Sequence, residues 1–251
     1  MVTGASTGIG EATARLLRAR GWDVVAVARR ADRLRALEEE TGAVAFAADL
    51  TSGTDVAALA SWLAETGPIH AVVQVAGGAR GADRVEDGDV ADWRWMYEAN
   101  VLSSQRLVAA LLPLLRRAAE SDGHADAVFV TSTAAQVAYP GGGGYNAAKA
   151  AESMLVHALR LELNGEPIRV VEVAPGMVRT EEFSLNRLGD RDAADRVYEG
   201  VEEPLVAGDV ADVIAYALDA PGHVNLDLVT MRPVAQSAQH LVARGPLHPR
   251  A

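Results

Sequence analysis

The chain has 251 residues and a formal net charge of −11, it contains no cysteine, and 49% of its residues are apolar. The lack of cysteine excludes a disulfide framework and Cys-ligated zinc, and it fits a reducing cytoplasm. The acidic charge argues against a nucleic-acid groove. Because no run of about 18 apolar residues and no signal-peptide pattern occurs, we expect a soluble cytoplasmic protein without a membrane segment.

Short valine-rich runs recur along the chain and have the pattern of strands that are buried on both faces. These runs span residues 22–28, 43–48, 69–76, 126–132, 168–174 and 226–231. Segments with helical spacing lie between them, and two of these, 11–21 and 31–42, end at a glycine in the position of a helix C-cap. The alternation predicts an α/β protein with a doubly wound, mostly parallel sheet. No flexible linker divides the chain, so residues 1–251 are predicted to form one domain.

The stretch TGASTGIG near the start is the first candidate ligand-binding motif. Gly4, Gly8 and Gly10 allow a tight turn into a helix that begins near Ile9, and they let a pyrophosphate approach the free N–H groups of that helix. Three glycines also fit an ordinary turn, so the motif needs support from elsewhere. The strand before it has only residues 1–2, which means that it is unusually short or that residues upstream are missing.

The stretch YNAAK provides that support. Tyr145 and Lys149 are four residues apart, so on a helix their side chains project toward one side. This spacing alone is weak evidence because it often arises by chance. Thirteen residues before the tyrosine, Ser132 ends a predicted strand, where sites gather in such sheets, and Asn100 is a polar residue in an otherwise apolar helix.

Together these motifs resemble those of the short-chain dehydrogenase/reductase family, in the family's order and spacing and over essentially the whole chain. The resemblance implies a single-domain Rossmann fold with about seven strands and helices on both faces. The matching features are the glycine turn, Asp49-Leu50, Asn100, Ser132, Tyr145-x-x-x-Lys149 and the PGMVRT segment at 175–180.

The resemblance also implies roles for individual residues. Tyr145 transfers a proton, Ser132 holds the substrate carbonyl, Lys149 binds the ribose hydroxyls, Asn100 holds a water in a proton relay, and Asp49 contacts the adenine. Thr180 and the backbone of Val178 meet the nicotinamide carboxamide. The full predicted set of cofactor-binding residues is Gly4, Ser6, Thr7, Gly8, Ile9, Gly10, Arg29, Arg30, Asp49, Leu50, Ala76, Gly77, Tyr145, Lys149, Pro175, Gly176, Val178 and Thr180.

One segment departs from the family pattern. Where relatives have N-N-A-G, this chain has QVAG at residues 74–77. The backbone of Ala76 and Gly77 can still pass beside the adenosine ribose, but Val75 cannot make the side-chain hydrogen bonds of the missing asparagine. We therefore expect a loss of local rigidity or of cofactor affinity, with the chemistry unchanged.

The chemistry of these residues agrees with the implied roles. A free phenol titrates near pH ~10, so Tyr145 needs neighbouring cations, such as Lys149 and an oxidised nicotinamide, to lower its pKa. In the reductive direction, NADPH delivers hydride to the carbonyl carbon, Tyr145 protonates the oxygen and Ser132 steadies its growing charge. No metal is required, and the six histidines have no ligand spacing.

The end of the second strand predicts the cofactor. Arg29 lies nineteen residues after Gly10, and neither it nor Arg30 is acidic. An acidic residue at this place receives the ribose of NAD, whereas arginine receives the 2′-phosphate of NADP. Two solvated arginines at the head of a helix are the alternative. We therefore expect NADP.

The substrate is less defined. The C-terminal third, in segments within residues 181–237, resembles NADP-dependent 3-hydroxy acid dehydrogenases, which act on serine and allo-threonine. It also resembles clavulanic aldehyde reductases, which share an Arg-Pro at residues 232–233. In the family, the segment at about 177–207 forms a lid over the substrate. Arg187 in this lid and Arg232 are the two candidates to hold a substrate carboxylate. The tail at about 238–251 is predicted to be flexible.

Two further predictions concern class and assembly. A non-catalytic NADP-binding sensor is the alternative from another class, and the complete set of catalytic residues argues against it. The segments 107–115 and 152–163 are more apolar than one sheet face requires. Because relatives pair the corresponding helices about two-fold axes, we expect a homodimer or a homotetramer.

Overall fold

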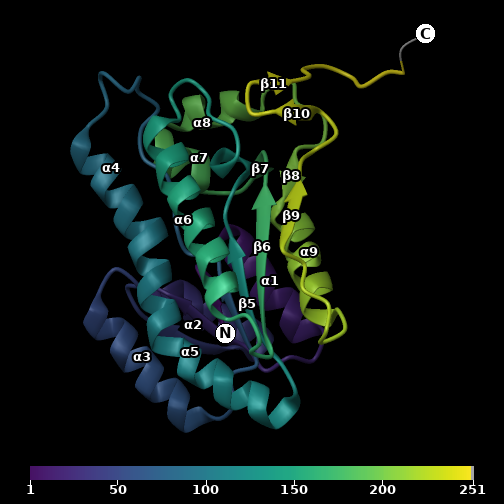
Figure 1. The fold of residues 1–251 in the computed structure, drawn as a ribbon. Helices are drawn as coiled ribbons and strands as arrows, with labels where there is room; N and C mark the ends of the chain where they lie inside the picture. The colour runs from purple at the N-terminus through teal and green to yellow at the C-terminus, as the bar shows by residue number, and fades with distance from the viewer. Residues whose placement is uncertain (250–251) are drawn as a thin grey trace.

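The central sheet of the protein contains seven strands, all parallel. They are β1 Val2–Thr3, β2 Val25–Ala28, β3 Val44–Ala47, β4 Ala71–Gln74, β5 Ala125–Val130, β6 Ile168–Pro175 and β9 Leu228–Met231. The computed structural model describes residues 1–249, and in Figure 1 the sheet runs through its centre. The order β3-β2-β1-β4-β5-β6-β9 reverses direction between β1 and β4. This order confirms the predicted doubly wound sheet of about seven strands.

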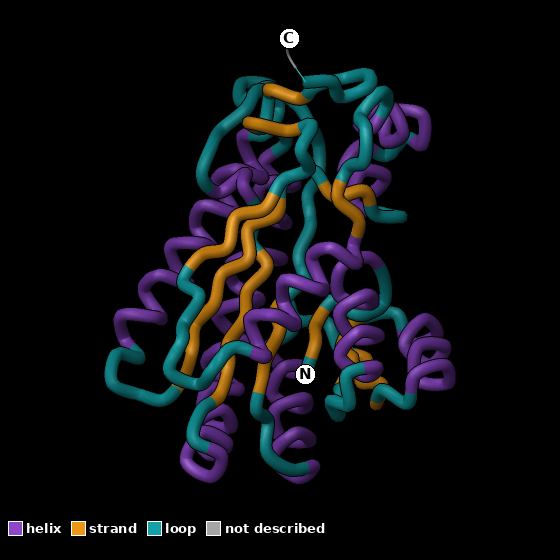
Figure 2. Tube along the Cα trace, turned by 90° about the vertical axis from the view of Figure 1, so that its right-hand side faces the viewer, coloured by secondary structure: helices purple, strands orange, loops and turns teal. Residues whose placement is uncertain are grey.

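Helices cover both faces of the sheet, as Figure 2 shows at right angles to Figure 1. Three pack against one face: α1 Gly8–Ala19, α2 Ala31–Thr41 and α9 Ala207–Asp219. Three pack against the other: α3 Gly53–Thr66, α5 Ser103–Asp122 and α6 Gly143–Glu162. Gly42 caps α2 in the predicted left-handed conformation. No helix in residues 1–249 is long and apolar enough to cross a membrane.

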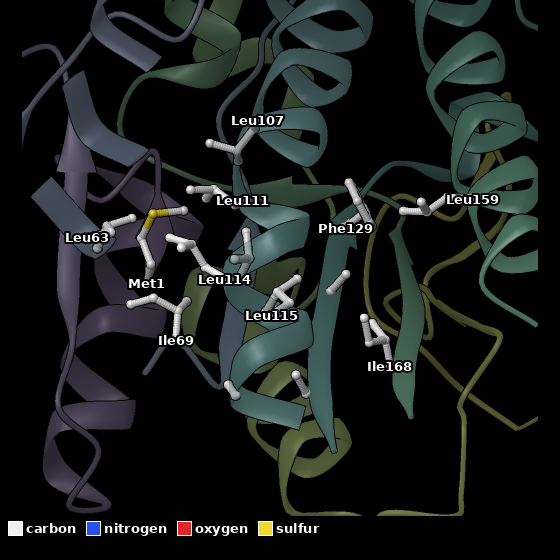
Figure 3. Close-up of a cluster of buried hydrophobic side chains, with 14 of the residues drawn as sticks. Met1, Leu63, Ile69, Leu107, Leu111, Leu114, Leu115, Phe129, Leu159 and Ile168 are labelled. Carbon is white, nitrogen blue, oxygen red and sulfur yellow. The ribbon is translucent and has the colours of Figure 1, made fainter. Parts of the chain in front are cut away.

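Two hydrophobic cores lie on opposite sides of the sheet. Along β5, Ala127 and Phe129 belong to one core, whereas Val128 and Val130 belong to the other. Successive side chains of a strand point to opposite faces, so a strand between two helical layers is apolar at every position. Figure 3 shows the first core, where Phe129 and Leu111 lie between the sheet and α5. The continuous apolar runs in the sequence therefore arise, as predicted, from strands that are buried on both faces.

Most strands are shorter than the apolar runs that predict them, whereas β6 extends one residue beyond the run at 168–174. β1 has only two residues although it lies between β2 and β4, where Val2 pairs with both Ala26 and Val73. The run at 22–28 begins three residues before β2, because the N–H of Trp22 still bonds to the carbonyl of Leu17 in α1. Backbone bonds to neighbouring elements, which apolar patterns do not reveal, thus set the strand ends.

One long helical segment has three parts. α4 Val90–Tyr97 continues directly into a single π-helical turn, η1 Glu98–Leu102, and then into α5. A π turn is wider than an α turn and is frequently found at functional sites. Asn100 lies in the middle of this turn and is fully buried.

The segment predicted to form a lid over the substrate, named the lid from here on, lies above the carboxyl ends of the strands, and a C-terminal hairpin lies beside it (Figure 1). The lid consists of β7 Val178–Arg179, α7 Phe183–Leu188, α8 Arg191–Tyr198 and β8 Leu205–Val206, and β7 pairs with β8 at its base. The hairpin consists of β10 Gln236–Ala238 and β11 Leu241–Val242. Beyond it, the N–H of Gly245 donates to the carbonyl of Gly200 at 2.6 Å. Flexibility of residues 238–251 stays a prediction, and residues 250–251 lie outside the described residues.

Candidate active site

A cavity of about 1080 Å³ opens at the carboxyl ends of the strands. The residues that follow β1 to β6 meet here because parallel strands end at the same edge of a sheet. Ser132 and Arg187 line the cavity, whereas Asn100 and Arg232 do not. The cavity brings together every predicted cofactor-binding residue, namely Gly4, Ser6, Thr7, Gly8, Ile9, Gly10, Arg29, Arg30, Asp49, Leu50, Ala76, Gly77, Tyr145, Lys149, Pro175, Gly176, Val178 and Thr180. Their contacts with a cofactor stay a prediction.

The glycine turn forms one end of the cavity. Gly4 and Gly8 have φ angles of +63° and +55°, which residues with a side chain rarely adopt. A Cβ on Gly10 would overlap the carbonyl of Gly4. Thr7 is the N-cap of α1, but its side chain makes no capping bond. Its buried Oγ1 has no hydrogen-bond partner within residues 1–249. This hydroxyl and the free N–H groups of the first helical turn fit a bound diphosphate.

The QVAG loop after β4 is held by side chains from its neighbours. Oγ1 of Thr3 donates to Oε1 of Gln74 at 2.7 Å and accepts from the N–H groups of Val75 and Ala76 at 2.9 and 3.0 Å. Nε2 of Gln74 donates to the carbonyl of Ala76 at 3.2 Å. These bonds pin the loop although the family's asparagine is missing. The effect of its loss on cofactor affinity stays a prediction.

Ser132 and Tyr145 both line the cavity, and their side chains lie close enough for the Ser132 hydroxyl to act on the pKa of Tyr145. Oγ of Ser132 accepts from the N–H of Ala134 at 3.0 Å, because Ser132 caps a short 3₁₀ helix, η2 Thr133–Ala135. Tyr145 lies in the first turn of α6, where Gly144 lets this helix approach α4: a Cβ there would overlap the side chain of Met96. The glycine run before the tyrosine thus sets the position of the phenol.

Lys149 lies one turn further along α6 and is almost fully buried, with 4% of its surface exposed. Its Nζ donates to Oε2 of Glu152 at 2.7 Å and to the carbonyl of Val130 at 3.2 Å. Oε1 of Glu152 accepts from the hydroxyl of Ser104 at 3.0 Å. The sequence analysis did not single out Glu152. Its signal is an acidic residue three positions after Lys149 at the start of a mostly apolar helical stretch.

The sequence predicts that Lys149 and an oxidised nicotinamide lower the pKa of Tyr145, and in the structure Lys149 does act in this direction, but burial outweighs it. Burial raises the pKa of Tyr145, and the positive charge of Lys149 opposes this rise without cancelling it. Burial alone would lower the pKa of Lys149, but the charges of Glu152, Tyr145 and Glu172 raise it overall. The ammonium therefore stays charged, and part of its field is neutralised by Glu152.

Asn100 lies behind the cavity wall and braces it. Its Nδ2 donates to the carbonyls of Met96 and Gly78 at 2.6 and 2.9 Å, and its Oδ1 accepts from the N–H of Gly78 at 3.1 Å. A Cβ on Gly77 would lie 2.5 Å from this Oδ1 and 3.6 Å from Nζ of Lys149. Asn100 is thus close to Lys149, and its role in a proton relay stays a prediction.

The two arginines after β2 have different surroundings. Arg29 is exposed at the cavity rim. Arg30 donates from Nη1 to Oε1 of Glu182 in the lid at 2.7 Å and from Nε to the hydroxyl of Ser6 at 3.2 Å. The guanidinium of Arg30 therefore joins the glycine turn to the lid.

The structure separates the two candidates for substrate binding. Arg187 of α7 lines the cavity, and each nitrogen of its guanidinium makes one hydrogen bond. Nη1 donates to the hydroxyl of Tyr139 at 2.9 Å, Nη2 to the carbonyl of Gly141 at 2.9 Å and Nε to the carbonyl of Gly81 at 3.1 Å. Its guanidinium carbon lies 5.7 Å from the centre of the Tyr145 ring. Arg232 lies outside the cavity beside Gly176, and its buried Nε has no partner within residues 1–249. A contribution of Arg232 to a site in an oligomer stays a prediction.

The arrangement of Ser132, Tyr145, Lys149 and Arg187 supports proton transfer to or from a bound molecule that carries an anionic group. A phenol, a fixed hydroxyl and a buried ammonium converge at one end of the cavity, and a guanidinium lies above them. Within residues 1–249, no group of three or more His, Asp or Glu side chains is placed to hold a metal ion.

Comparison with known proteins identifies the class of protein that this fold and site define. A sequence profile described as short chain dehydrogenase matches residues 1–188, and the chain belongs to this family of oxidoreductases. An uncharacterized oxidoreductase of Mycobacterium tuberculosis is 49% identical over 99% of this chain and 95% of the relative. Sulfoacetaldehyde reductase 2 of Chromohalobacter salexigens is 35% identical over 94% of each chain.

A solved structure agrees in fold. The closed form of a serine dehydrogenase complexed with NADP⁺ superposes with a TM-score of 0.89 and 31% identity, covering 99% of this chain and 98% of that one. Serine 3-dehydrogenases and NADP-dependent 3-hydroxy acid dehydrogenases also match. These findings confirm the Rossmann fold and the predicted resemblance to the 3-hydroxy acid dehydrogenase branch.

Proposed function

We propose that the protein is a cytoplasmic NADP-dependent oxidoreductase that interconverts a small 3-hydroxy acid and its carbonyl compound. The observation that carries the substrate class is the guanidinium of Arg187, 5.7 Å from the ring of Tyr145. A cation at this distance can hold a carboxylate while the phenol meets the oxygen on the reacting carbon. Relatives named for serine and for sulfoacetaldehyde act on molecules with an anionic group, which supports this substrate class.

Both the local geometry and the relatives support NADP as the proposed cofactor. Arg29 stands exposed at the end of β2, where a 2′-phosphate lies in dinucleotide folds. The glycine turn and the unpartnered hydroxyl of Thr7 fit a diphosphate. A structural neighbour is complexed with NADP⁺. When bound, NADPH supplies the hydride that reduces the carbonyl carbon.

The residues of this chain divide the remaining work. Tyr145 donates the phenolic proton to the carbonyl oxygen as negative charge develops there. Ser132, whose Oγ is fixed by the N–H of Ala134, can turn its proton toward the same oxygen. Lys149 stabilises the phenolate that forms and reaches the ribose hydroxyls. Asn100 positions a water that returns a proton to Tyr145.

The first test is loss of the acid. Tyr145→Phe removes the proton donor and should lower turnover by ~100-fold or more, with NADPH binding largely kept. Absorbance of the nicotinamide measures turnover, and fluorescence titration measures binding. Near-normal turnover in this variant would show that Tyr145 is not the acid. A wild-type protein that binds NADPH without turning over any aldehyde or alcohol in a broad panel would favour the sensor alternative.

The second test concerns the substrate anion. Arg187→Ala should raise KM for an aldehyde that carries a carboxylate by about 10-fold or more, and spare a neutral aldehyde of the same size. Arg179→Ala is the matched control: this lid arginine stacks on Tyr198, 5.0 Å from the ring centre, and does not line the cavity. Equal effects of Arg187→Ala on both aldehydes would favour an uncharged or larger substrate, such as that of a clavulanic aldehyde reductase.

We also propose that the chain assembles as a homodimer or a homotetramer. On α6, Met154 and Leu161 are 65% and 79% exposed, although both are large and apolar. Covering them against a second copy would remove this surface from water. Sedimentation at micromolar concentration should show a dimer or a larger species, and Met154→Glu combined with Leu161→Glu should weaken it.

A further inference from the structure

The buried ion pair of α6 contains one more residue than the proposed chemistry uses. Lys149 and Glu152 lie in the interior, with side chains 5% and 1% exposed, and their Nζ and Oε2 atoms are 2.7 Å apart. We propose that Glu152 is a positioning residue that neutralises part of the Lys149 charge, keeps the Tyr145 phenol protonated and so favours carbonyl reduction. This inference rests on the proposed role of Tyr145 as the acid.

The geometry fixes both the carboxylate and the ammonium. One oxygen of Glu152 accepts from Lys149, and the other accepts from Ser104 on α5, so neither has to turn toward solvent. The hydroxyl of Ser104 also lies 2.7 Å from the backbone carbonyl of Asn100, so its single proton goes to one of these two oxygens at a time. Nζ of Lys149 donates two of its three N–H groups, one to Glu152 and one to the carbonyl of Val130. One N–H remains for the cavity.

Every charged group packed around the phenol enters the balance. On α6, the positive charge of Lys149 favours the phenolate, and the negative charge of Glu152 opposes it. The η2–α6 loop brings Tyr139, and Ser132 lies two residues after the end of β5. Arg187 of α7 lies above the ring.

Further from the ring, β6 brings Glu172, which faces Lys149 and pairs with His157 of α6 at 3.0 Å. Among the carboxylates of residues 1–249, only that of Glu152 is hydrogen-bonded to Nζ of Lys149. Removal of its charge leaves the full ammonium field on Tyr145, and a stronger positive field favours the phenolate.

The pH dependence of turnover in both directions tests this inference. In Glu152→Gln, which keeps the shape and the Ser104 bond, the pH at which alcohol oxidation becomes half-maximal should fall by about 1 unit. The pH at which carbonyl reduction becomes half-maximal should fall by the same amount. Glu152→Asp should restore the wild-type midpoints because it restores the charge. Glu166→Gln, which removes an exposed carboxylate paired with Arg116, is the matched control and should change neither midpoint.

Two further variants keep the test decisive. If Glu152→Gln does not fold, Ser104→Ala should shift the midpoints in the same direction by less, because Glu152 then ionises less readily. Unchanged or raised midpoints in a folded variant would overturn the inference, as would a loss of stability without a pH shift. Tyr145→Phe separates a failure of this inference from a failure of the proposed function. If Tyr145→Phe keeps its turnover, Tyr145 is not the acid. If Tyr145→Phe loses turnover while Glu152→Gln has the wild-type midpoints, only the proposed role of Glu152 is wrong.

Discussion

Two ionic contacts border the cavity, and they differ in their exposure to water. The Lys149–Glu152 pair on α6 is buried, with side chains 5% and 1% exposed. The Arg30–Glu182 pair joins the glycine turn to the lid at the same separation of 2.7 Å, but its side chains are 39% and 18% exposed. Equal distances thus conceal different energies, because solvent screens the second pair and not the first.

This difference assigns separate tasks to the two pairs. A buried pair is costly to break, so its charges can fix the protonation of a neighbour. An exposed pair contributes little to stability, so it can rearrange when a ligand competes for one partner. The floor of the cavity is therefore fixed electrostatically, whereas the rim is adjustable.

Breaking the buried pair has the largest expected effect. Lys149→Met leaves Glu152 buried without its cation and should lower the free energy of unfolding by about 3–5 kcal/mol near neutral pH. Burial raises the pKa of Glu152 in the folded state, so the carboxyl group favours folding at low pH, and this contribution is lost as pH rises. The loss of stability in Lys149→Met should therefore shrink as pH falls toward ~4.3, the pKa of a glutamate side chain in an unfolded chain. Urea unfolding at pH 5 and pH 8 measures it.

A double variant is the control for this prediction. Lys149→Met combined with Glu152→Met replaces both charges by apolar side chains and should recover most of the lost stability. An equal loss at both pH values in the single variant would mean that an unpaired carboxylate is not its cause.

Altering the rim should change binding rather than folding. Arg29→Asp places a like charge where the 2′-phosphate of NADPH is proposed to lie, and should weaken NADPH roughly 10- to 100-fold at low salt. NADH binding should change little. The matched control is Arg35→Asp, an exposed arginine of α2 that does not line the cavity. A wild-type protein that prefers NADH would contradict the prediction.

The smallest expected effect is a gain. Glu182→Gln releases Arg30 from its half-buried partner and should raise NADPH affinity by up to about 5-fold, most clearly at low salt. Fluorescence titration at two salt concentrations measures this gain. Glu181→Gln is the control, since Glu181 lies 3.9 Å from Arg33 and outside the cavity. Weaker binding in Glu182→Gln would show that this carboxylate supports the cofactor site.

Local patterns explain what the sequence predicted well. A strand buried on both faces leaves a continuous apolar run, a left-handed cap requires a glycine such as Gly42, and Tyr145 and Lys149 share a helix. Each of these constraints acts over a few residues. The alternation of strands and helices could therefore be predicted without long-range contacts, whereas the roles of most residues around the cavity were implied by the resemblance to the family.

Other features depend on contacts between distant segments. Arg187 and Arg232 were equal candidates in the sequence, and only the packing of α7 over α6 brings Arg187 to the cavity. Burial, which outweighs the field of Lys149 at Tyr145, arises from several elements together. Glu152 was missed for the same reason: its position marks it as unusual, but its bonds to Lys149 and Ser104 require α5 and α6 to be packed.

The single π turn between α4 and α5 also makes the chain sensitive to a change in length. An α-helix turns by about 100° for each residue, so deletion of one residue in η1 Glu98–Leu102 would rotate one end of the helix relative to the other. With α5 held on the sheet, Ser104 would stay beside Glu152, while Trp95 would turn away from the cavity wall. This segment should therefore accept amino-acid replacements on its exposed side more readily than any insertion or deletion.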